Sequence, residues 1–198
     1  MNDKLQWDPG TLIYPLPAVM VSCGQDATSY NIITIAWTGT ICTQPAMCYI
    51  SVRPERHSYK LIKNSGEFVI NLSTMQLARA TDWCGVKSGR DFDKFKEMNL
   101  TPRKGEKVLA PIIVESPVNI ECKVKEIHEL GVHHMFISEV VHIQATEKYM
   151  NPATGKFELS GSQPISYMHG SYYEMGKRIG KFGYSVEKKR KKKSRPKE

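Results

Sequence analysis

Apolar residues in this chain gather in short runs that are rich in Val, Ile, Thr and Tyr and end at Gly, Pro, Asn or Asp. Runs with this composition and these boundaries are typical of β-strands. In the first half of the chain they predict strands over residues 18–24, 31–42, 47–52 and 67–72. In the second half they predict two long antiparallel strands, joined by a turn at residues 131–133, over residues 119–130 and 134–146.

The first long strand and the end of the chain carry two further signals. Apolar residues alternate with charged ones from Ile120 to Lys125, and Ile127 then falls out of phase. This slip predicts a β-bulge near Glu126. A last apolar segment, residues 164–173, fits either a final strand or a segment docked against the sheet.

Two stretches follow helical spacing instead. Residues 55–63 come after Pro54 and end at an Asn-Ser-Gly sequence, which are common helix boundaries. Residues 74–83 place apolar side chains three apart, and Ser73 and Gln76 have the spacing of a capping box. With at least six strands, two short helices and no regular alternation of the two, the pattern predicts a mainly β fold, an antiparallel barrel with helices at its ends.

Length and charge set the expected domain organisation. The chain has 198 residues, 40% of them hydrophobic, which predicts a single domain with a substantial core over residues 1–185. The net charge of +8 is concentrated in residues 186–198, which hold eight Lys or Arg and two Glu, whereas the rest of the chain holds 20 basic and 18 acidic residues. This basic tail has almost no apolar residues and is predicted to be disordered. An alternative hypothesis is a nucleic-acid-associated barrel protein that binds phosphate through the tail.

Several classes of protein are disfavoured. No apolar run approaches the roughly 18 residues of a membrane span, and the first residues carry no secretory signal, so a cytoplasmic location is expected. The five cysteines form no CxxC, which predicts free, mostly buried thiols and no metal site. The motifs GxGxxG, GxxxxGKS/T, GxSxG and HExxH do not occur, so we do not expect a dinucleotide to bind in the Rossmann manner.

Two polar stretches carry the candidate chemistry. In the first, residues 31–59, hydroxyl side chains stand among strand-forming residues, and Arg53 and Arg56 can each bind a phosphate with two hydrogen bonds. His57 and Ser58 fall near a predicted helix N-terminus, which favours anions. The alternative is a set of ordinary β-forming threonines followed by a solvated helix start.

The second polar stretch is CGVKSGRDFDKF, residues 84–95, whose two glycines let the backbone approach a ligand closely. Ser88, Arg90 and Lys94 can reach an anion there. The alternative is an exposed loop with charge pairs. Cys84 begins the stretch, and either a redox role or an inert thiol fits it.

As a set, these stretches resemble the flavin reductase-like family, which includes flavoredoxins. The resemblance spans roughly residues 14–180 and rests on PLPAVMVSC, NIITIAWTGTICTQPAMCYISVRPERHSYKLI, EFVINL and CGVKSGRDFDKF. A fifth segment, YMHGSYYEMGKRIG, is similar to the closing segment of the flavoredoxin branch. The resemblance implies an antiparallel split β-barrel, bound FMN, and a homodimer with the flavin near the subunit interface.

The resemblance also implies roles for particular residues. Strand residues would line the isoalloxazine ring and ribityl chain, His57 and Ser58 would meet the phosphate, and the second polar stretch would close over the flavin. The implied cofactor-binding residues are Asn31, Thr34, Ala36, Trp37, Thr38, Ser51, Val52, Arg53, His57, Ser58, Ser88, Gly89, Arg90 and Lys94.

Two versions of the function follow from the resemblance. In the first, the protein is an oxidoreductase in which NAD(P)H transfers hydride to the flavin. In the second, bound FMN exchanges electrons with a redox protein, such as a ferredoxin-like partner, and the flavoredoxin-like ending favours this version. Trp37 fits either a stacking or a core position, and His169 and Tyr172 fit either an approach to the flavin or a packed closing segment.

Overall fold

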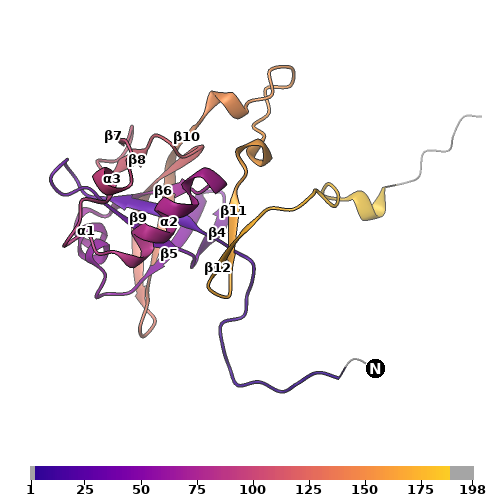
Figure 1. Ribbon diagram of the computed structural model, residues 1–198, viewed down its shortest axis with the longest axis horizontal. Coiled ribbons are helices and arrows are strands. Elements are labelled where there is room, and N and C mark those ends of the chain that lie inside the picture. Colours follow the sequence, from indigo (N-terminus) through magenta and orange to yellow (C-terminus); the bar gives the residue numbers. More distant parts are fainter. Residues whose placement is uncertain (1–2, 188–198) are drawn as a thin grey trace, which may run out of the picture.

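The computed structural model describes residues 3–187 and shows a body of curved β-sheet from which both ends of the chain extend (Figure 1). The strands are β1 (Leu16–Pro17), β2 (Val19–Cys23), β3 (Asn31–Ile35), β4 (Thr38–Thr43), β5 (Ala46–Val52), β6 (Glu67–Leu72), β7 (Pro102–Lys104), β8 (Pro111–Ile113), β9 (Val118–Glu129), β10 (His134–Ala145), β11 (Ile165–Met168) and β12 (Ser171–Glu174). The helices are α1 (His57–Ser65), α2 (Ala78–Val86) and α3 (Lys94–Glu97), with short 3₁₀ turns at Met75–Leu77, Glu147–Tyr149, Leu159–Ser162 and Tyr184–Val186. The basic tail predicted over residues 186–198 lies outside the described residues, apart from Val186 and Glu187.

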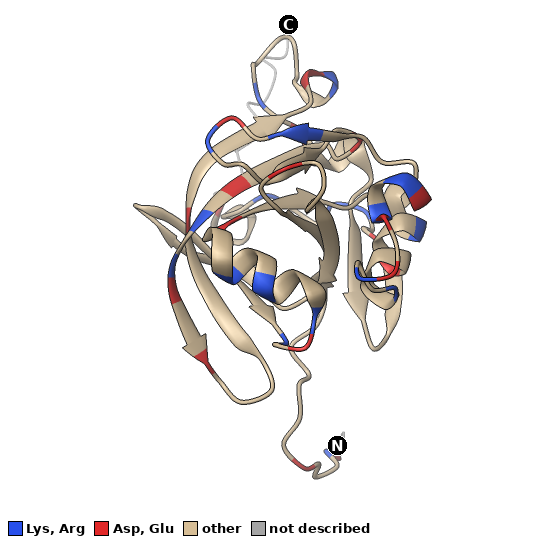
Figure 2. Ribbon diagram, turned by 90° about the vertical axis from the view of Figure 1, so that its left-hand side faces the viewer, with Lys and Arg blue, Asp and Glu red and all other residues tan. Residues whose placement is uncertain are grey.

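Seven strands form one antiparallel sheet in the order β3-β2-β6-β9-β10-β5-β4. Its two edge strands, β3 and β4, follow each other in the chain with only Ala36 and Trp37 between them. So short a link cannot cross a flat sheet of this width, so the sheet curls until its edges approach each other. Figure 2 shows the strands curving around an interior. The result is the split β-barrel that the family resemblance implies, with the split at the Ala36–Trp37 link.

The structure corrects two predictions about element boundaries. The strand expected over residues 31–42 breaks at the Ala36–Trp37 link, where the chain passes from one sheet edge to the other. The helix expected from residue 74 begins instead as the 3₁₀ turn at Met75–Leu77. α2 then continues to Val86, into the first residues of the second polar stretch.

The starts of the helices also differ from the predictions. α1 begins at His57, two residues later than expected. The capping box predicted from Ser73 and Gln76 is wrong, because Ser73 Oγ instead accepts a hydrogen bond from Thr81 Oγ1 at 2.8 Å. This bond ties α2 to the segment that follows β6.

The two long predicted strands are β9 and β10, which pair with each other in antiparallel fashion. Ile137 lies opposite Glu126, whereas Ser138 lies opposite Val124, so Lys125 is an extra residue on β9. This register shift confirms the bulge predicted near Glu126. The last predicted segment is a pair of strands: β11 and β12 form a hairpin that joins β1 in a separate three-stranded sheet.

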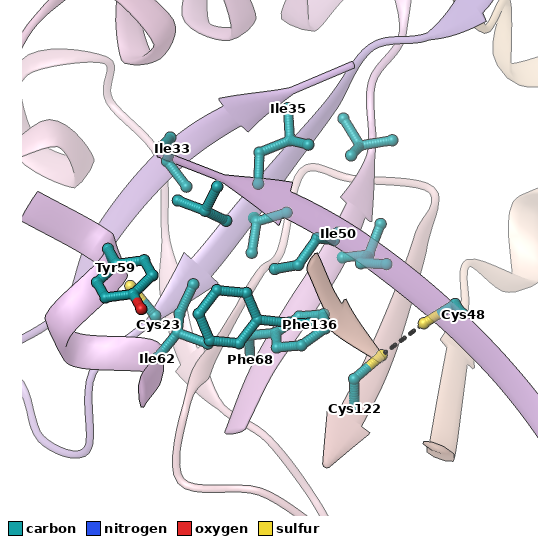
Figure 3. Packing of buried hydrophobic residues seen from close by; sticks show 14 residues of the cluster. Cys23, Ile33, Ile35, Cys48, Ile50, Tyr59, Ile62, Phe68, Cys122 and Phe136 are labelled. Carbon is teal, nitrogen blue, oxygen red and sulfur yellow. Dashed lines mark hydrogen bonds between the residues drawn. The ribbon is translucent and has the colours of Figure 1, made fainter. Parts of the chain in front are cut away.

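One large apolar cluster fills the interior of the barrel. Figure 3 shows Ile62 of α1 beside Phe68 of β6 and Phe136 of β10, and all three side chains are fully buried. Burying a side chain of this size stabilises a fold by about 1.5–3 kcal/mol. The thiols of Cys48 and Cys122 meet in the same cluster, with 3.5 Å between their Sγ atoms. α1 is therefore packed onto the barrel by its apolar face, which fixes the position of its N-terminus.

A buried polar network joins the sheet to the segment around β8. Asn71 on β6 is fully buried, and its Nδ2 donates to Met20 O and to Ser22 Oγ, both at 2.9 Å. Its Oδ1 accepts hydrogen bonds from Ile113 N at 2.9 Å and from Asn119 Nδ2 at 2.8 Å. Because both ends of the amide are bonded, the network avoids the cost of a buried unsatisfied polar group.

The described residues also bear on cysteine, membrane and metal chemistry. All five cysteines are free and four of them are buried, which confirms the expectation of free, mostly buried thiols. Across residues 3–187, every helix is too short or too polar to cross a membrane. In the same residues, no group of three or more His, Cys, Asp or Glu side chains is placed to hold a metal ion.

Candidate functional site

A cleft in two joined halves lies beside the split of the barrel. The first, which we call the strand half, has a volume of about 310 Å³ and includes the Ala36–Trp37 link. The second, which we call the helix half, has a volume of about 250 Å³ and includes the start of α1. Ile33, Arg56 and Gly85 line both halves, so one elongated small molecule can occupy the two together.

Strand backbone and apolar side chains dominate the strand half. β3, the link to β4 and the end of β5 contribute Thr34, Ala36, Trp37, Ser51, Val52 and Arg53. α2 and the β11–β12 hairpin contribute Asp82, Val86, Tyr167, Gly170 and Tyr172. Trp37 is 41% exposed, and its ring centroid lies 5.6 Å from that of His133 on the β9–β10 turn. Trp37 therefore stands at the rim of the cleft and not in the core.

The helix half combines positive charge with an uncapped helix N-terminus. Arg56 is the N-cap residue of α1, and within residues 3–187 no side chain caps the first-turn amides of that helix. Lys87, Arg90 and Lys94 also line this half. Burial, followed by the positive charges of Arg90 and Lys94, lowers the pKa of His57. Because amides at a helix N-terminus and basic side chains both favour negative charge, this half suits a phosphate group.

Two buried polar side chains are bonded to each other in the helix half. Asn31 Nδ2 donates to Ser58 Oγ at 2.7 Å, which joins the start of β3 to the first turn of α1. Gly89 lies directly against this pair, since a Cβ at that position would be 2.0 Å from Asn31 Oδ1. Only glycine allows the loop backbone to come this close without displacing Asn31.

Lys94, near the end of the second polar stretch, is the first residue of the single-turn helix α3 and is buried. Its Nζ donates to Ile32 O at 2.7 Å and to Cys84 O at 2.8 Å, which joins β3 to α2. Burial lowers the pKa of Lys94 to about 8. An ammonium group has three N–H donors, and within residues 3–187 these two bonds leave the third for a ligand.

The arginines around the cleft are ordered by contacts to neighbouring carbonyls and one carboxylate. Arg53 Nε lies 2.7 Å from Glu55 Oε1, and Arg90 Nη2 donates to Glu55 O at 3.0 Å. Arg56 Nη1 donates to Gly85 O at 3.5 Å. The side chains of Arg53 and Glu55 are 49% and 58% exposed, and an exposed pair stabilises a fold by about 1 kcal/mol at most. These contacts therefore serve mainly to place positive charge at the cleft.

Cys84 lines the helix half, and Cys23 is buried near it. Burial raises the pKa of Cys84 to about 11 and the pKa of Cys23 to about 12. Both thiols therefore stay protonated near neutral pH, and a protonated thiol is a poor nucleophile. Of the two interpretations of Cys84, the structure favours the buried, inert thiol.

The β11–β12 hairpin is attached to α2 beside the strand half. Tyr172 Oη donates to Asp82 Oδ1 at 3.3 Å, and burial together with the carboxylate of Asp82 raises the pKa of Tyr172 to about 12. At the tip of the hairpin, the ring centroid of His169 lies 4.5 Å from that of Tyr14. Tyr172 therefore lines the cleft, whereas His169 packs against the segment before β1.

The structure brings together nearly all of the residues singled out in the sequence. Of the predicted cofactor-binding residues, all except Thr38 line one half of the cleft or the other. Thr38 Oγ1 instead donates to Tyr49 O at 2.6 Å. The hydroxyl of Thr34 donates to Thr81 O, although its side chain does border the strand half. The strand hydroxyls therefore bond mainly to backbone carbonyls of the protein itself.

Sequence reasoning missed several lining residues, namely Ile33, Asp82, Gly85, Val86, Tyr167 and Gly170. Gly85 carried a local signal, because it is a glycine in the second polar stretch, and a Cβ there would lie 3.1 Å from Thr34 Cβ. Asp82, Val86 and the hairpin residues carried no such signal, because the fold alone brings them to the cleft.

An incompletely closed antiparallel barrel with a cleft beside its split defines this chain as a protein of the split-barrel class, to which solved flavin reductase structures also belong. A family model described as "Flavin reductase like domain" matches residues 11–176. The chain therefore belongs to the flavin reductase-like family, and its fold is that of a flavoprotein.

Relatives and solved structures agree with this assignment. The chain is 28% identical over 163 residues to an uncharacterized protein of Archaeoglobus fulgidus, an alignment that covers 81% of this chain and 86% of the relative. The flavoredoxin of Desulfovibrio vulgaris (Miyazaki F) matches with a TM-score of 0.85 and 30% identity, over 93% of this chain and 100% of that one. The flavoredoxin from Methanosarcina acetivorans matches with a TM-score of 0.82 and 26% identity, over the same shares of the two chains. These likenesses support flavin binding by this chain.

Proposed function

We propose that this chain binds FMN in the cleft and moves electrons through it between a donor and an acceptor. The observation that carries the proposal is the joining of two unlike halves. The strand half offers apolar and backbone surface for a flat heterocycle, and the helix half offers an uncapped helix N-terminus with basic side chains. A ligand that suits both has a flat ring at one end and a phosphate at the other, as FMN has.

The residues of the cleft fit this ligand. The strand half takes the ring against β3, the Ala36–Trp37 link and β5, and the helix half takes the phosphate at the amides of His57 and Ser58. Gly85 and Gly89 keep the facing backbone close, because a Cβ at either position would press on β3. The proposed contacts are the predicted residues that line the cleft, together with Arg56 and Gly85. When bound, the flavin supplies the redox chemistry, while the chain binds it, orients it and shields it from water.

The first test is an absorption spectrum of the purified protein, followed by chromatography of any cofactor released on denaturation. We expect flavin bands and released FMN. A colourless protein that fails to take up added FMN would overturn the proposal.

The phosphate site can be tested separately with a variant pair on α1. Arg56→Gln removes a charge that lines both halves, whereas Lys60→Gln removes one from an exposed position on the same helix that does not line the cleft. We expect Arg56→Gln to reduce the preference for FMN over riboflavin, which lacks the phosphate, by about tenfold, the effect of losing one charge-assisted hydrogen bond. Lys60→Gln should leave that preference unchanged, and equal behaviour of the two variants would contradict the assignment of the helix half.

For the donor, we propose a redox protein, so that the chain acts as an FMN electron carrier. The match to flavoredoxins over 93% of this chain supports this version. The competing version is an oxidoreductase that takes hydride from NAD(P)H. The FMN-loaded protein is mixed with NADH and with NADPH under anaerobic conditions, and the flavin absorbance is followed. Inertness to both supports the carrier, and rapid bleaching by either identifies the enzyme.

We propose that the protein is a cytoplasmic homodimer. Support for the dimer comes from the two ends of the chain, which extend from the body in Figure 1. Large apolar side chains on these ends are 77% to 107% exposed, at Trp7, Ile13, Ile179 and Phe182. Free cysteines are typical of a reducing compartment. Light scattering of the full chain should give twice the monomer mass, and fractionation of the native host should recover the protein with the soluble contents of the cell.

A further inference from the structure

After β12 the chain leaves the body of the protein as an exposed arm, residues 175–187 (Figure 1). The basic side chains of this arm are all exposed, and they are Lys177, Arg178 and Lys181. Within residues 3–187 the one ion pair that these three side chains make joins Lys181 to Glu187. The arm therefore presents positive charge to the surroundings of the protein.

The basic tail follows the arm in the sequence and adds much more positive charge. Residues 175–198 hold 11 Lys or Arg and two Glu, whereas residues 1–174 hold 17 basic and 18 acidic residues. The arm and the tail together therefore carry the whole net positive charge, and the rest of the chain is close to neutral. Charge of one sign in one segment speeds the encounter with an oppositely charged macromolecule. This distribution of charge suits an acidic partner.

A short turn near the end of the arm exposes apolar side chains beside the basic tail. The ring of Tyr184 packs against Gly180, where a Cβ would lie 2.6 Å from Tyr184 Cδ1. Tyr184 and Val186 are nevertheless 57% and 83% exposed. Protein–protein interfaces combine an apolar, often aromatic centre with a polar rim. Because an aliphatic side chain such as Val186 cannot stack on a base, this pair favours a protein partner over a nucleic acid.

A groove of about 1240 Å³ lies between the arm and the 3₁₀ turn at Leu159–Ser162. Leu159 and Pro164 line it from the body, and Met175 lines it from the start of the arm. Sites for small molecules have volumes of about 300–1,000 Å³. The groove is larger than such a site and suits a loop or a helix of another protein.

The arm begins close to the strand half of the cleft. β12 belongs to the hairpin whose residues Gly170 and Tyr172 line that half. Tyr172 and Met175 are three residues apart in the chain, so at most about 11 Å separates their Cα atoms. The hydrogen bond from Tyr172 to Asp82 attaches this part of the hairpin to α2. A protein held by the arm is therefore close to the place proposed for the flavin ring.

We propose that the arm and the basic tail dock an acidic redox protein and hold it beside the strand half, where it reduces the flavin. This inference rests on the proposed function, in which bound FMN takes electrons from a redox protein. Two reduced one-electron donors supply the two electrons that convert FMN to FMNH₂, and the two protons come from the solvent. The positive charge brings the donors to the cleft one after the other.

The test follows reduction of the FMN-loaded full chain by two acidic electron donors, a plant-type [2Fe–2S] ferredoxin and a two-cluster [4Fe–4S] ferredoxin. Each ferredoxin is reduced beforehand, freed of excess reductant and mixed with the protein under anaerobic conditions. Flavin absorbance gives the second-order rate constant at about 10 mM and about 1 M salt, where the Debye length is about 30 Å and about 3 Å.

Three full-length variants are compared with the wild-type protein. In the tail variant, all eight Lys and Arg of residues 188–198 are changed to Gln. The arm variant combines Lys177→Gln with Arg178→Gln. Its matched control combines Lys60→Gln with Lys104→Gln, two exposed positions outside the cleft. An FMN titration and light scattering verify that each variant keeps its cofactor and its oligomeric state.

We expect the tail variant to react about tenfold more slowly than the wild-type protein at low salt, and within about twofold of it at high salt. The arm variant should be slower by about two- to threefold at low salt, and its control should be unchanged. The rate reached at saturating ferredoxin should be the same in all of them, because the charges act on association. Tyr184→Ser should raise the ferredoxin concentration for half-saturation about fivefold.

The other outcomes separate the inference from the function on which it rests. Equal rates for the wild-type protein and the tail variant at low salt, or no reduction by either ferredoxin, would overturn the docking surface while the FMN site stands. If the full chain takes up no FMN, the proposed function itself fails, and the inference with it.

Two results would assign the positive charge to something else. If the tail variant loses binding to single-stranded RNA or to anionic phospholipid vesicles but keeps its rate with ferredoxin, the charge serves that polyanion and the inference is wrong. If the arm variant becomes monomeric, the arm belongs to the contact between two copies of the chain, and the docking of a redox protein there is overturned.

Discussion

Because Gly89 lies so close to Asn31, we expect even the substitution of Gly89 by alanine to reduce the stability of the protein strongly. Gly89→Ala places a methyl group 2.0 Å from Asn31 Oδ1 and 2.6 Å from Asn31 Cγ. Ordinary contacts of a Cβ begin near 3.4 Å, so one of the two groups has to move by more than 1 Å. Asn31 is 3% exposed and its Nδ2 is bonded to Ser58 Oγ, so its side chain has no free direction in which to turn.

The magnitude follows from what this movement breaks. Overpacking a well-packed site costs about 1–3 kcal/mol. Loss of the Asn31–Ser58 hydrogen bond adds about 0.5–1.5 kcal/mol. If the partly exposed loop around Gly89 moves instead, the bond survives and the cost is at the lower end. We therefore expect Gly89→Ala to lower the free energy of unfolding by about 1–4 kcal/mol, and to weaken FMN binding because the loop and Asn31 both line the helix half.

Urea unfolding followed by tryptophan fluorescence measures the effect on stability, and a flavin titration measures the effect on binding. Gly176→Ala is the matched control, because a Cβ at Gly176 has no atom within 4 Å. The double variant Asn31→Ala with Gly89→Ala removes the atom that the new methyl group would strike. It should therefore be no less stable than Asn31→Ala alone, which gives a coupling energy between the two sites of about 1 kcal/mol or more.

Either of two results would contradict this prediction. Gly89→Ala protein that unfolds at the same urea concentration as wild-type protein would show that the close approach does not exist in solution. Strict additivity in the double-variant cycle would show that any loss of stability in Gly89→Ala comes from the loop backbone and not from Asn31.

Three further predictions concern other parts of the molecule. Protonated Lys94 attracts a phosphate, and its pKa is about 8, so the affinity for FMN should fall as pH rises through about 8, by up to about tenfold per pH unit. The affinity for riboflavin, which lacks the phosphate, should not change with pH in this range. Tyr172→Phe removes the bond to Asp82, so hydrogen exchange of the β12 amides should speed up by a factor of about two to ten while β6 is unaffected. Asn71→Ala leaves buried partners unsatisfied and should lower the free energy of unfolding by about 2–4 kcal/mol in urea, where an unchanged midpoint would contradict the network.

The strands could be predicted because their signals are local. Runs of β-branched residues with Gly, Pro or Asn at their ends located β2 and β6 to within a residue or two. The break between β3 and β4 could not be predicted, because Ala36 and Trp37 carry no turn signal. Closure of the sheet imposes that break, and closure depends on strands that are distant in the sequence.

The candidate site divides in the same way. Ser88 and Gly89 were predicted because polar and glycine residues stand out in a short stretch and because that stretch resembles a known family. The buried role of Lys94 was not predictable, since its two hydrogen-bond partners come from β3 and α2. The contact between the rings of Tyr30 and Phe95 was missed for a related reason, because these two residues are far apart in the chain and meet only through packing.

The split of the barrel links the stability of the fold to binding of a ligand. β3 and β4 are the edges of the sheet, and Ser51 N donates to Trp37 O at 2.9 Å beside their junction. A ligand in the strand half would contact β3 and β5 at once. It would therefore connect two parts of the sheet that are not joined to each other by strand pairing. A ligand that binds only the folded protein stabilises it in proportion to the logarithm of the ligand concentration. Binding of a ligand in the cleft and unfolding of the seven-stranded sheet are therefore coupled, and the gap between β3 and β4 is the place where they are coupled.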